Sequence, residues 1–115
     1  MDSCELSTAR LVVQVVRFVD DRQPGHVECK FVDAEGRRHS FVDKAPIFSS
    51  KPLDAASKYP QPGAVRCEVL RRWRDDEGQE LVRVSTAHPD DIESTEGLSE
   101  FVVLSAQVST DGLTT

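Results

Sequence analysis

One pattern occurs twice in the sequence and constrains the fold more than any other feature. Each copy begins with Gln-Pro-Gly and continues with alternating apolar and charged side chains, over residues 23–31 and again 38 residues later over residues 61–69. Successive side chains of a strand point to opposite faces, so this period of two predicts two strands, each with one dry and one solvated face. The positions expected to share a dry interior are Val27, Cys29, Phe31, Val65, Cys67 and Val69.

Turn signals surround both copies. Proline fixes φ and the following Gly25 or Gly63 tolerates positive φ, so each Gln-Pro-Gly predicts a type II turn at the start of a strand. Each strand then reaches an acidic segment that ends in Glu-Gly, at residues 33–36 and 75–78. Such a segment is typical of a hairpin with a left-handed glycine. The return strands are expected at residues 37–44 and 79–86.

Two further strands are expected outside the repeat, at residues 10–19 and 100–107. Both are apolar on both faces, which predicts that they are covered on both sides or pair with each other. No strong amphipathic helix is found, and the best helical candidate is a short turn at residues 54–58 within the long connection 44–60.

Six strands with two similar hairpins predict an all-β fold, a small partly open barrel, with a two-sheet sandwich as the alternative. The barrel is expected to occupy residues 9–107 as a single domain. Residues 1–8 are expected to form an N-terminal tail and residues 108–115 a flexible C-terminal tail.

The charge distribution bears on partners. The net charge of −6 arises entirely from residues 84–115, which hold six acidic residues and neither lysine nor arginine. A binder of phosphate backbones needs a positive footprint, so nucleic acid is an unfavoured partner. No apolar run approaches the ~20 residues that span a bilayer. The three cysteines lack paired spacing, so no metal or other cofactor is expected and a reducing cytoplasm is the expected location.

The acidic loop, residues 87–99, is the densest functional candidate. Asp90, Asp91, Glu93 and Glu96 could contact a basic region of another protein. They could also bind a hard cation through carboxylate oxygens, although the spacing differs from that of an EF-hand. A solvated connection is the alternative, since charge runs usually face water. The leading hypothesis is a small accessory or neutralising protein that binds its partner through this loop.

An enzyme is the second hypothesis. A small hydrolase or ligand-binding enzyme would place its site at the mouth of the barrel, where His39 or His88 would exchange protons with Asp90 or Glu93. A thiol and histidine pair is disfavoured because Cys29 falls on the inward face of its strand, where a cysteine is typically a small core hydrophobe.

Single-stranded nucleic-acid binding is the third hypothesis. It would use the guanidinium groups and the indole of Arg66, Arg71, Arg72 and Trp73, because bases stack on aromatic rings. The same residues also fit a structural interpretation in which an arginine lies across the tryptophan ring.

The run from residue 27 to residue 47, Val-Glu-Cys-Lys-Phe-Val-Asp-Ala-Glu-Gly-Arg-Arg-His-Ser-Phe-Val-Asp-Lys-Ala-Pro-Ile, is joined later by Gln61-Pro62-Gly63 and by Phe-Val-Val-Leu at 101–104. Together these segments resemble small uncharacterised bacterial proteins of similar length, over most of residues 8–107. The resemblance implies a compact β-barrel and a bacterial, cytoplasmic origin. It implies no site residues.

Overall fold

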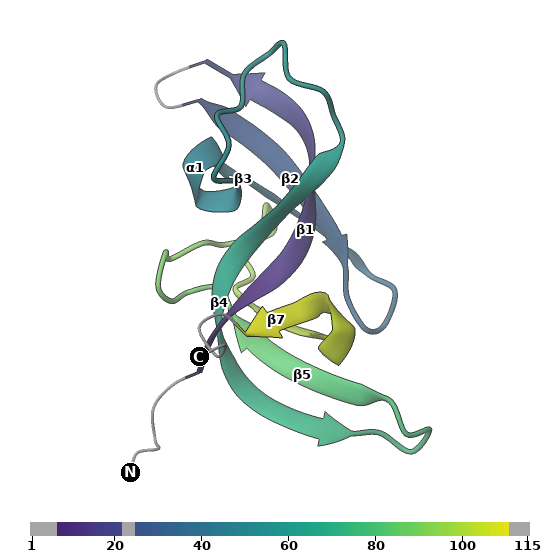
Figure 1. The fold of residues 1–115 in the computed structure, drawn as a ribbon. Coiled ribbons are helices and arrows are strands. Elements are labelled where there is room, and N and C mark those ends of the chain that lie inside the picture. The colour runs from purple at the N-terminus through teal and green to yellow at the C-terminus, as the bar shows by residue number, and fades with distance from the viewer. Residues whose placement is uncertain (1–6, 22–24, 111–115) are drawn as a thin grey trace.

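The chain folds as one antiparallel sheet curled into a partly open barrel (Figure 1), and the computed structural model describes residues 7–21 and 25–110. The strands follow the order β3-β2-β1-β4-β5-β6, and β7 pairs with β1. This confirms the all-β, partly open barrel in place of the two-sheet sandwich. The elements are β1 (Ser7–Asp20), β2 (His26–Val32), β3 (Arg38–Lys44), α1 (Ala45–Phe48), β4 (Gln61–Arg74), β5 (Glu80–Ser85), β6 (Glu100–Leu104), the 3-10 turn η2 (Ser105–Gln107) and β7 (Val108–Thr110).

Two long strands, β1 and β4, run through the whole sheet. Each has 14 residues, and they pair from Ser7 opposite Val69 to Val15 opposite Gln61. On its other edge β4 pairs with β5 from Glu68 to Arg74, with a register shift between Val69 and Arg71. Such a shift bends a strand and raises its twist, and β4 is visibly curved in Figure 1. The bend lets one strand serve both ends of the barrel.

The predicted inward face is confirmed. Five of its six members are buried, and Val69 is partly buried against the same core. The core also takes Phe101 from β6, whose ring lies edge-on to Phe31 at 5.1 Å and to Phe41 at 5.9 Å between centroids. Aromatic pairs of this geometry contribute about 0.5–1.5 kcal/mol beyond their buried area. They therefore help to hold the far strand β6 against the β2–β3 hairpin.

The two edge strands, β3 and β6, are bridged by backbone hydrogen bonds. The N–H of Thr95 donates to the carbonyl of Ser40 in β3 (2.8 Å), and the N–H of Ala34 donates to the carbonyl of Val102 in β6 (2.9 Å). The bridging groups come from the loop before β6 and from the turn of the β2–β3 hairpin. The two edges are thus linked through turns and are not paired directly with each other.

The two hairpin turns are built alike, as their shared sequence predicts. Gly36 and Gly78 both have positive φ, 86° and 83°. In each turn the first aspartate, Asp33 or Asp75, bonds backbone to backbone with the residue four positions later, and its Oδ1 accepts two further backbone N–H groups. The duplication therefore extends to the hydrogen-bond pattern of the turns.

The type II turn predicted at Gly63 is wrong, whereas Gly25 does have positive φ (94°). Gly63 lies inside β4 opposite Val13 and lacks positive φ. A Cβ atom there would meet the Phe48 carbonyl oxygen and Val15 Cγ2, each at 2.9 Å. Glycine is needed for this close approach of α1 to the sheet. Residues 23–24 of the first Gln-Pro-Gly lie outside the described residues.

The expected covering of residues 10–19 and 100–107 on both faces is also wrong. β1 pairs with β2, β4 and β7, whereas β6 pairs with β5, so the two segments are not partners. Val12 is 49% exposed, because the outer face of β1 has no second layer above it. The last expected strand ends at Leu104, and η2 begins at Ser105.

The short helical segment forms at α1, ahead of the expected position. Pro46 lies in its first turn, where the missing N–H is not needed. Residues 54–58 instead form a turn in which the N–H of Ser57 donates to the carbonyl of Asp54 (3.1 Å). Residues 108–110, assigned above to the C-terminal tail, form β7, and residues 1–6 and 111–115 lie outside the described residues.

Candidate functional site

The outer face of the sheet carries an apolar groove of about 480 Å³, which we call the β1–β2 groove. It lies where one edge of β1 is divided between two partners. β7 pairs with Ala9–Leu11 and β2 pairs from Gln14 onward, so Val12 and Val13 have a partner in neither strand. The groove is lined by apolar side chains with two cations, chiefly Val12, Val16, Val32, Ala106, Lys30 and Arg38.

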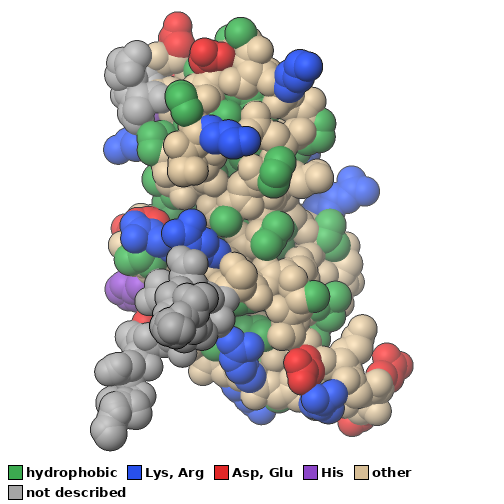
Figure 2. All heavy atoms as spheres, in the orientation of Figure 1, with side chains coloured by type: hydrophobic (Ala, Val, Ile, Leu, Met, Phe, Trp, Pro, Cys, Tyr) green, Lys and Arg blue, Asp and Glu red, His purple; other side chains and the backbone are tan. Residues whose placement is uncertain are grey.

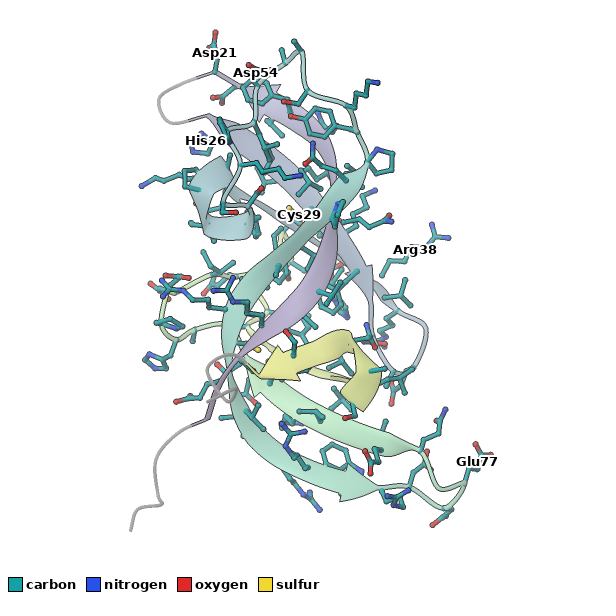
Figure 3. All side chains as sticks on the ribbon, viewed as in Figure 1. Asp21, His26, Cys29, Arg38, Asp54 and Glu77 are labelled. Atoms are coloured by element: carbon teal, nitrogen blue, oxygen red, sulfur yellow. The ribbon has the colours of Figure 1, made fainter. Side chains whose placement is uncertain are left out.

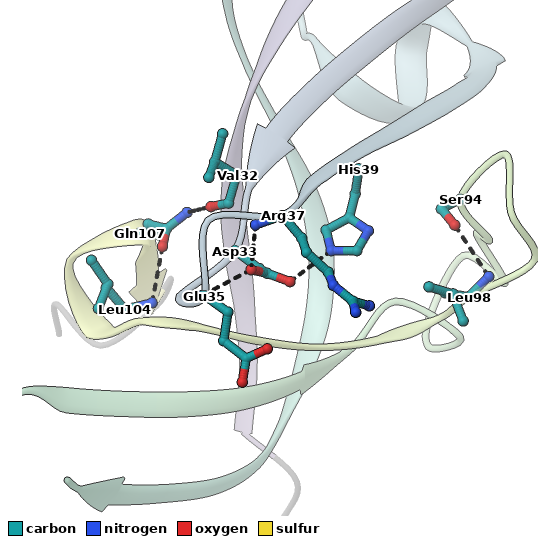
Figure 4. A network of polar contacts seen from close by, with 9 residues as sticks. All are labelled: Val32, Asp33, Glu35, Arg37, His39, Ser94, Leu98, Leu104 and Gln107. Carbon is teal, nitrogen blue, oxygen red and sulfur yellow. Dashed lines mark hydrogen bonds and ion pairs between the residues drawn. The ribbon is translucent and has the colours of Figure 1, made fainter.

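β1 and β2 form two walls of the groove, and η2 forms the third. Gln107 of η2 fixes this third wall to the end of β2. Its Nε2 donates to the Val32 carbonyl (2.7 Å), and its Oε1 accepts the Leu104 N–H (2.9 Å), as Figure 4 shows. Both ends of the amide are therefore used by the backbone. The wall is held by hydrogen bonds as well as by the chain connection, so the groove is formed in advance of any ligand.

Exposed valines mark the groove as an unusual surface. Val12 and Val32 are 49% and 47% exposed, and both line it. Single exposed apolar side chains are common, but contiguous ones tend to mark interaction sites. On the face drawn in Figure 2, hydrophobic side chains are spread among polar ones.

Two cations stand beside these valines. Arg38 is the direct cross-strand partner of Val32, and Lys30 precedes Val32 by two residues in β2, on the same face. Arg38 extends away from the sheet (Figure 3) and makes no ion pair with any residue that the structure describes. Lys30 is half exposed and lies 4.0 Å from Glu28 Oε2, while the other oxygen of Glu28 accepts Arg17 Nε (2.6 Å).

A buried histidine–aspartate pair lies under the β2–β3 hairpin. His39 Nε2 donates to Asp33 Oδ2 (2.8 Å; Figure 4), and the His39 ring packs against the rings of Phe31 and Phe101, at 5.1 Å and 4.8 Å between centroids. Burial acts to raise the pKa of Asp33, but hydrogen bonds from His39 and from the backbone of Arg37 and Glu35 hold that pKa below its ordinary value.

The His39–Asp33 pair does not line the β1–β2 groove. Nδ1 of His39 is buried without a hydrogen-bond partner in the described structure. The Oδ1 of Asp33 accepts backbone N–H groups of the turn, and its Oδ2 accepts the bond from His39. Both oxygens of the carboxylate are therefore hydrogen-bonded. We interpret the pair as a structural link between the turn and the core.

The acidic loop is firmly built into the barrel. Ile92 is buried, its N–H donates to the Thr86 carbonyl (2.9 Å), and its own carbonyl accepts the Thr86 hydroxyl (2.7 Å). Ser94 is also buried, and its hydroxyl accepts the N–H of Leu98 (3.1 Å; Figure 4). The loop therefore has an ordered frame from which its charged side chains project.

The four predicted contact residues of this loop divide into two groups. Asp90 is bound by Arg66 through two hydrogen bonds, from Nη2 (2.7 Å) and Nε (3.1 Å), so its charge is already paired. The hydrogen bonds that Arg66 donates to Asp90, together with the negative charge of Asp90, raise the pKa of Arg66. Asp91, Glu93 and Glu96 are exposed. The structure thus leaves three of the four carboxylates at the surface.

The proton-transfer pairs of the enzyme hypothesis are not formed. Within the described residues, no hydrogen bond or ion pair joins His39 or His88 to Asp90 or Glu93. His39 bonds to Asp33 and Asp90 bonds to Arg66 instead.

The residues of the nucleic-acid hypothesis are largely engaged with each other or with acids. Arg66 bonds to Asp90, and the Arg71 guanidinium lies 4.8 Å above the centre of the Trp73 ring. This confirms the structural interpretation in which an arginine covers the indole. Arg72 lines a separate cavity of about 280 Å³ beside Trp73.

Both described cysteines are core residues. Cys29 and Cys67 are free and fully buried, and desolvation by burial raises the pKa of their thiols to about 12 and about 11. A thiol needs to ionise to act as a nucleophile. The predicted structural role of these two residues is confirmed, and Cys4 lies outside the described residues.

Comparison with known proteins gives no match: no family model, no curated protein and no solved structure is similar to the chain. Among the helical segments of residues 7–21 and 25–110, none has the length and apolar character to cross a membrane.

Proposed function

We propose that this protein is a small protein-binding module that holds a short segment of a partner protein in the β1–β2 groove. The observation that carries the proposal is the groove itself, in which Val12 and Val32 are each about half exposed beside Val16 and Ala106. Leaving such side chains in water is unfavourable, at about 25 cal/mol for each Å² of apolar surface. A partner that covers them recovers this free energy.

The size and construction of the groove favour a peptide segment. Its volume of about 480 Å³ falls within the range of roughly 300–1,000 Å³ that ligand sites occupy. Because Gln107 fixes one wall in advance, less conformational entropy is lost on binding. A few side chains of an extended segment fit such a space.

The acidic loop is the second contact in this proposal. Asp91, Glu93 and Glu96 would meet a basic region of the same partner and accelerate association, since complementary charges act mainly on the encounter rate. The module would act in the cytoplasm, where Cys29 and Cys67 remain reduced.

Site-specific photocrosslinking in the producing cell tests the groove. A benzophenone amino acid is placed at Val32, and at Val42 as the control, since Val42 is 41% exposed on β3 and does not line the groove. We expect a discrete crosslinked partner from position 32 and none from position 42. Adding Val12→Thr should weaken the crosslink, because threonine keeps the strand preference but adds a hydroxyl.

Two results would contradict the proposal: no crosslinked protein from position 32, or the same products from both positions. The acidic loop is tested on the captured partner. Replacing Asp91, Glu93 and Glu96 by the corresponding amides should slow association at low salt. Amide replacements at Asp76 and Glu77, which remove two exposed charges from the β4–β5 turn, should leave the association rate nearly unchanged.

A further inference from the structure

The cations beside the β1–β2 groove indicate the chemistry of its occupant. Arg38 is exposed and unpaired among the described residues, although the chain has six more acidic than basic residues. The carboxylate of Glu28 on this hairpin binds Arg17 of β1 and lies near Lys30, so it is not paired with Arg38. An arginine left without a carboxylate in such an acidic protein is available to an external one.

The register of the hairpin places charge and apolar surface side by side. Arg38 lies directly across from Val32, and Lys30 lies across from Ser40, the next residue of β3 on that face. Side chains diagonal to each other on one sheet face are about 7–8 Å apart at their backbones. Lys30 and Arg38 can therefore reach the same anionic group above Val32.

We propose that the groove selects a partner segment in which an apolar residue is flanked by aspartate or glutamate. This inference rests on the proposed function and adds the sequence character of the bound segment. The apolar side chain lies on Val12, Val16, Val32 and Ala106. The neighbouring carboxylate binds the Arg38 guanidinium, whose planar fork matches a carboxylate, and Lys30 adds a second positive charge.

Selection by these cations is a short-range effect. The protein as a whole is negative and repels an acidic segment at a distance, but at physiological salt charges are screened beyond roughly 8 Å. A carboxylate within the groove is therefore influenced mainly by Arg38 and Lys30. The basic region of the partner binds at the acidic loop, which is a different surface.

Amide chemical-shift titration of the full chain with defined tetrapeptides tests the proposal. The acidic probe is acetyl-Asp-Leu-Phe-Asp-amide, and its matched probes carry Asn or Lys in place of both Asp residues. Octanoate is included to represent a small amphipathic acid. We expect the acidic probe to shift the amides of Val12, Val32 and Ala106, with weaker binding of the Asn probe and the weakest binding of the Lys probe.

Variants then assign the selectivity. Arg38→Gln should weaken binding of the acidic probe by about 1.5- to 5-fold, as expected for an exposed ion pair, and leave binding of the Asn probe unchanged. Lys58→Gln, the same change of charge on an exposed residue outside the groove, should have no effect. The spectra themselves report whether each variant is folded.

The other possible outcomes contradict either the acidic selectivity alone or the peptide-binding function as well. Equal affinity for the acidic and Asn probes, or preference for the Lys probe, would overturn the acidic selectivity and leave a peptide-binding groove. Shifts at the groove from octanoate with none from any peptide would overturn both proposals, because the site would then take a small amphipathic acid. No shifts from any probe would also contradict both.

Discussion

The two alike hairpin turns allow the His39–Asp33 bond to be measured against an internal control. In Asp33→Ala the turn loses two backbone hydrogen bonds, from Glu35 and Arg37, and the core loses the bond from His39. In Asp75→Ala the other turn loses two equivalent backbone bonds and nothing else. The difference between the two variants therefore isolates the histidine bond.

The size of that difference follows from the partners involved. A hydrogen bond to a charged group contributes about 1.5–3 kcal/mol, and here its loss leaves a buried imidazole with neither nitrogen bonded. With an unfolding entropy of about 2.1 cal/mol/K for each residue, the 115 residues give about 0.24 kcal/mol/K. We expect Asp33→Ala to lower the melting temperature by roughly 6–12 °C more than Asp75→Ala, by calorimetry at pH 7.

The pH dependence provides a second check. The pKa of Asp33 is lower in the folded state than its ordinary value of 3.8, so its ionised form stabilises the fold. This contribution is fully present above the unfolded pKa and is lost as the pH falls through the folded value. The excess destabilisation of Asp33→Ala should therefore shrink below about pH 4. Equal losses in the two variants at pH 7, or an excess that persists in acid, would refute the assignment.

Three further predictions concern the core and its contacts. Ile92→Ala should lower the free energy of unfolding in urea by about 2–5 kcal/mol, because Ile92 of the acidic loop is only 2% exposed; a loss under about 1 kcal/mol would contradict its role in anchoring the loop. Gly63→Ala should destabilise by about 1–3 kcal/mol through overpacking against Phe48, and an unchanged melting temperature would show that α1 moves freely. Iodoacetamide at pH 8 should modify Cys29 and Cys67 far more slowly in the native protein than in the unfolded chain; equal rates would contradict their burial.

The hairpins could be predicted from sequence because their determinants are local. Alternation placed Cys29 and Cys67 inward, and a glycine after each acidic turn fixed the return of the chain. Gly63 was assigned to a turn because Gln-Pro-Gly is typical of turns. A glycine is equally suited to a position in a strand where another backbone segment approaches closely. The choice depends on Phe48, which packs against this position in the fold.

The groove could not be predicted, because it depends on how β1 divides one edge between β2 and β7. Residues 100–107 contain neither proline nor glycine to mark the end of β6 at Leu104, so the sequence predicts one continuous strand there. The alternation of His39 with Phe41 does predict an inward histidine. Its carboxylate partner is the turn residue Asp33, which the sequence indicated only as a turn former.

The two bridges between β3 and β6 bear on how the protein behaves when it is concentrated. An open strand edge offers unpaired N–H and C=O groups to other chains and is a common starting point for aggregation. Here Thr95 and Ala34 of the same molecule already occupy acceptors on both edges. An incoming strand must displace the Thr95 bond to pair at Ser40 of β3, or the Ala34 bond to pair at Val102 of β6, so the loop and the hairpin turn hinder association with further copies of the chain.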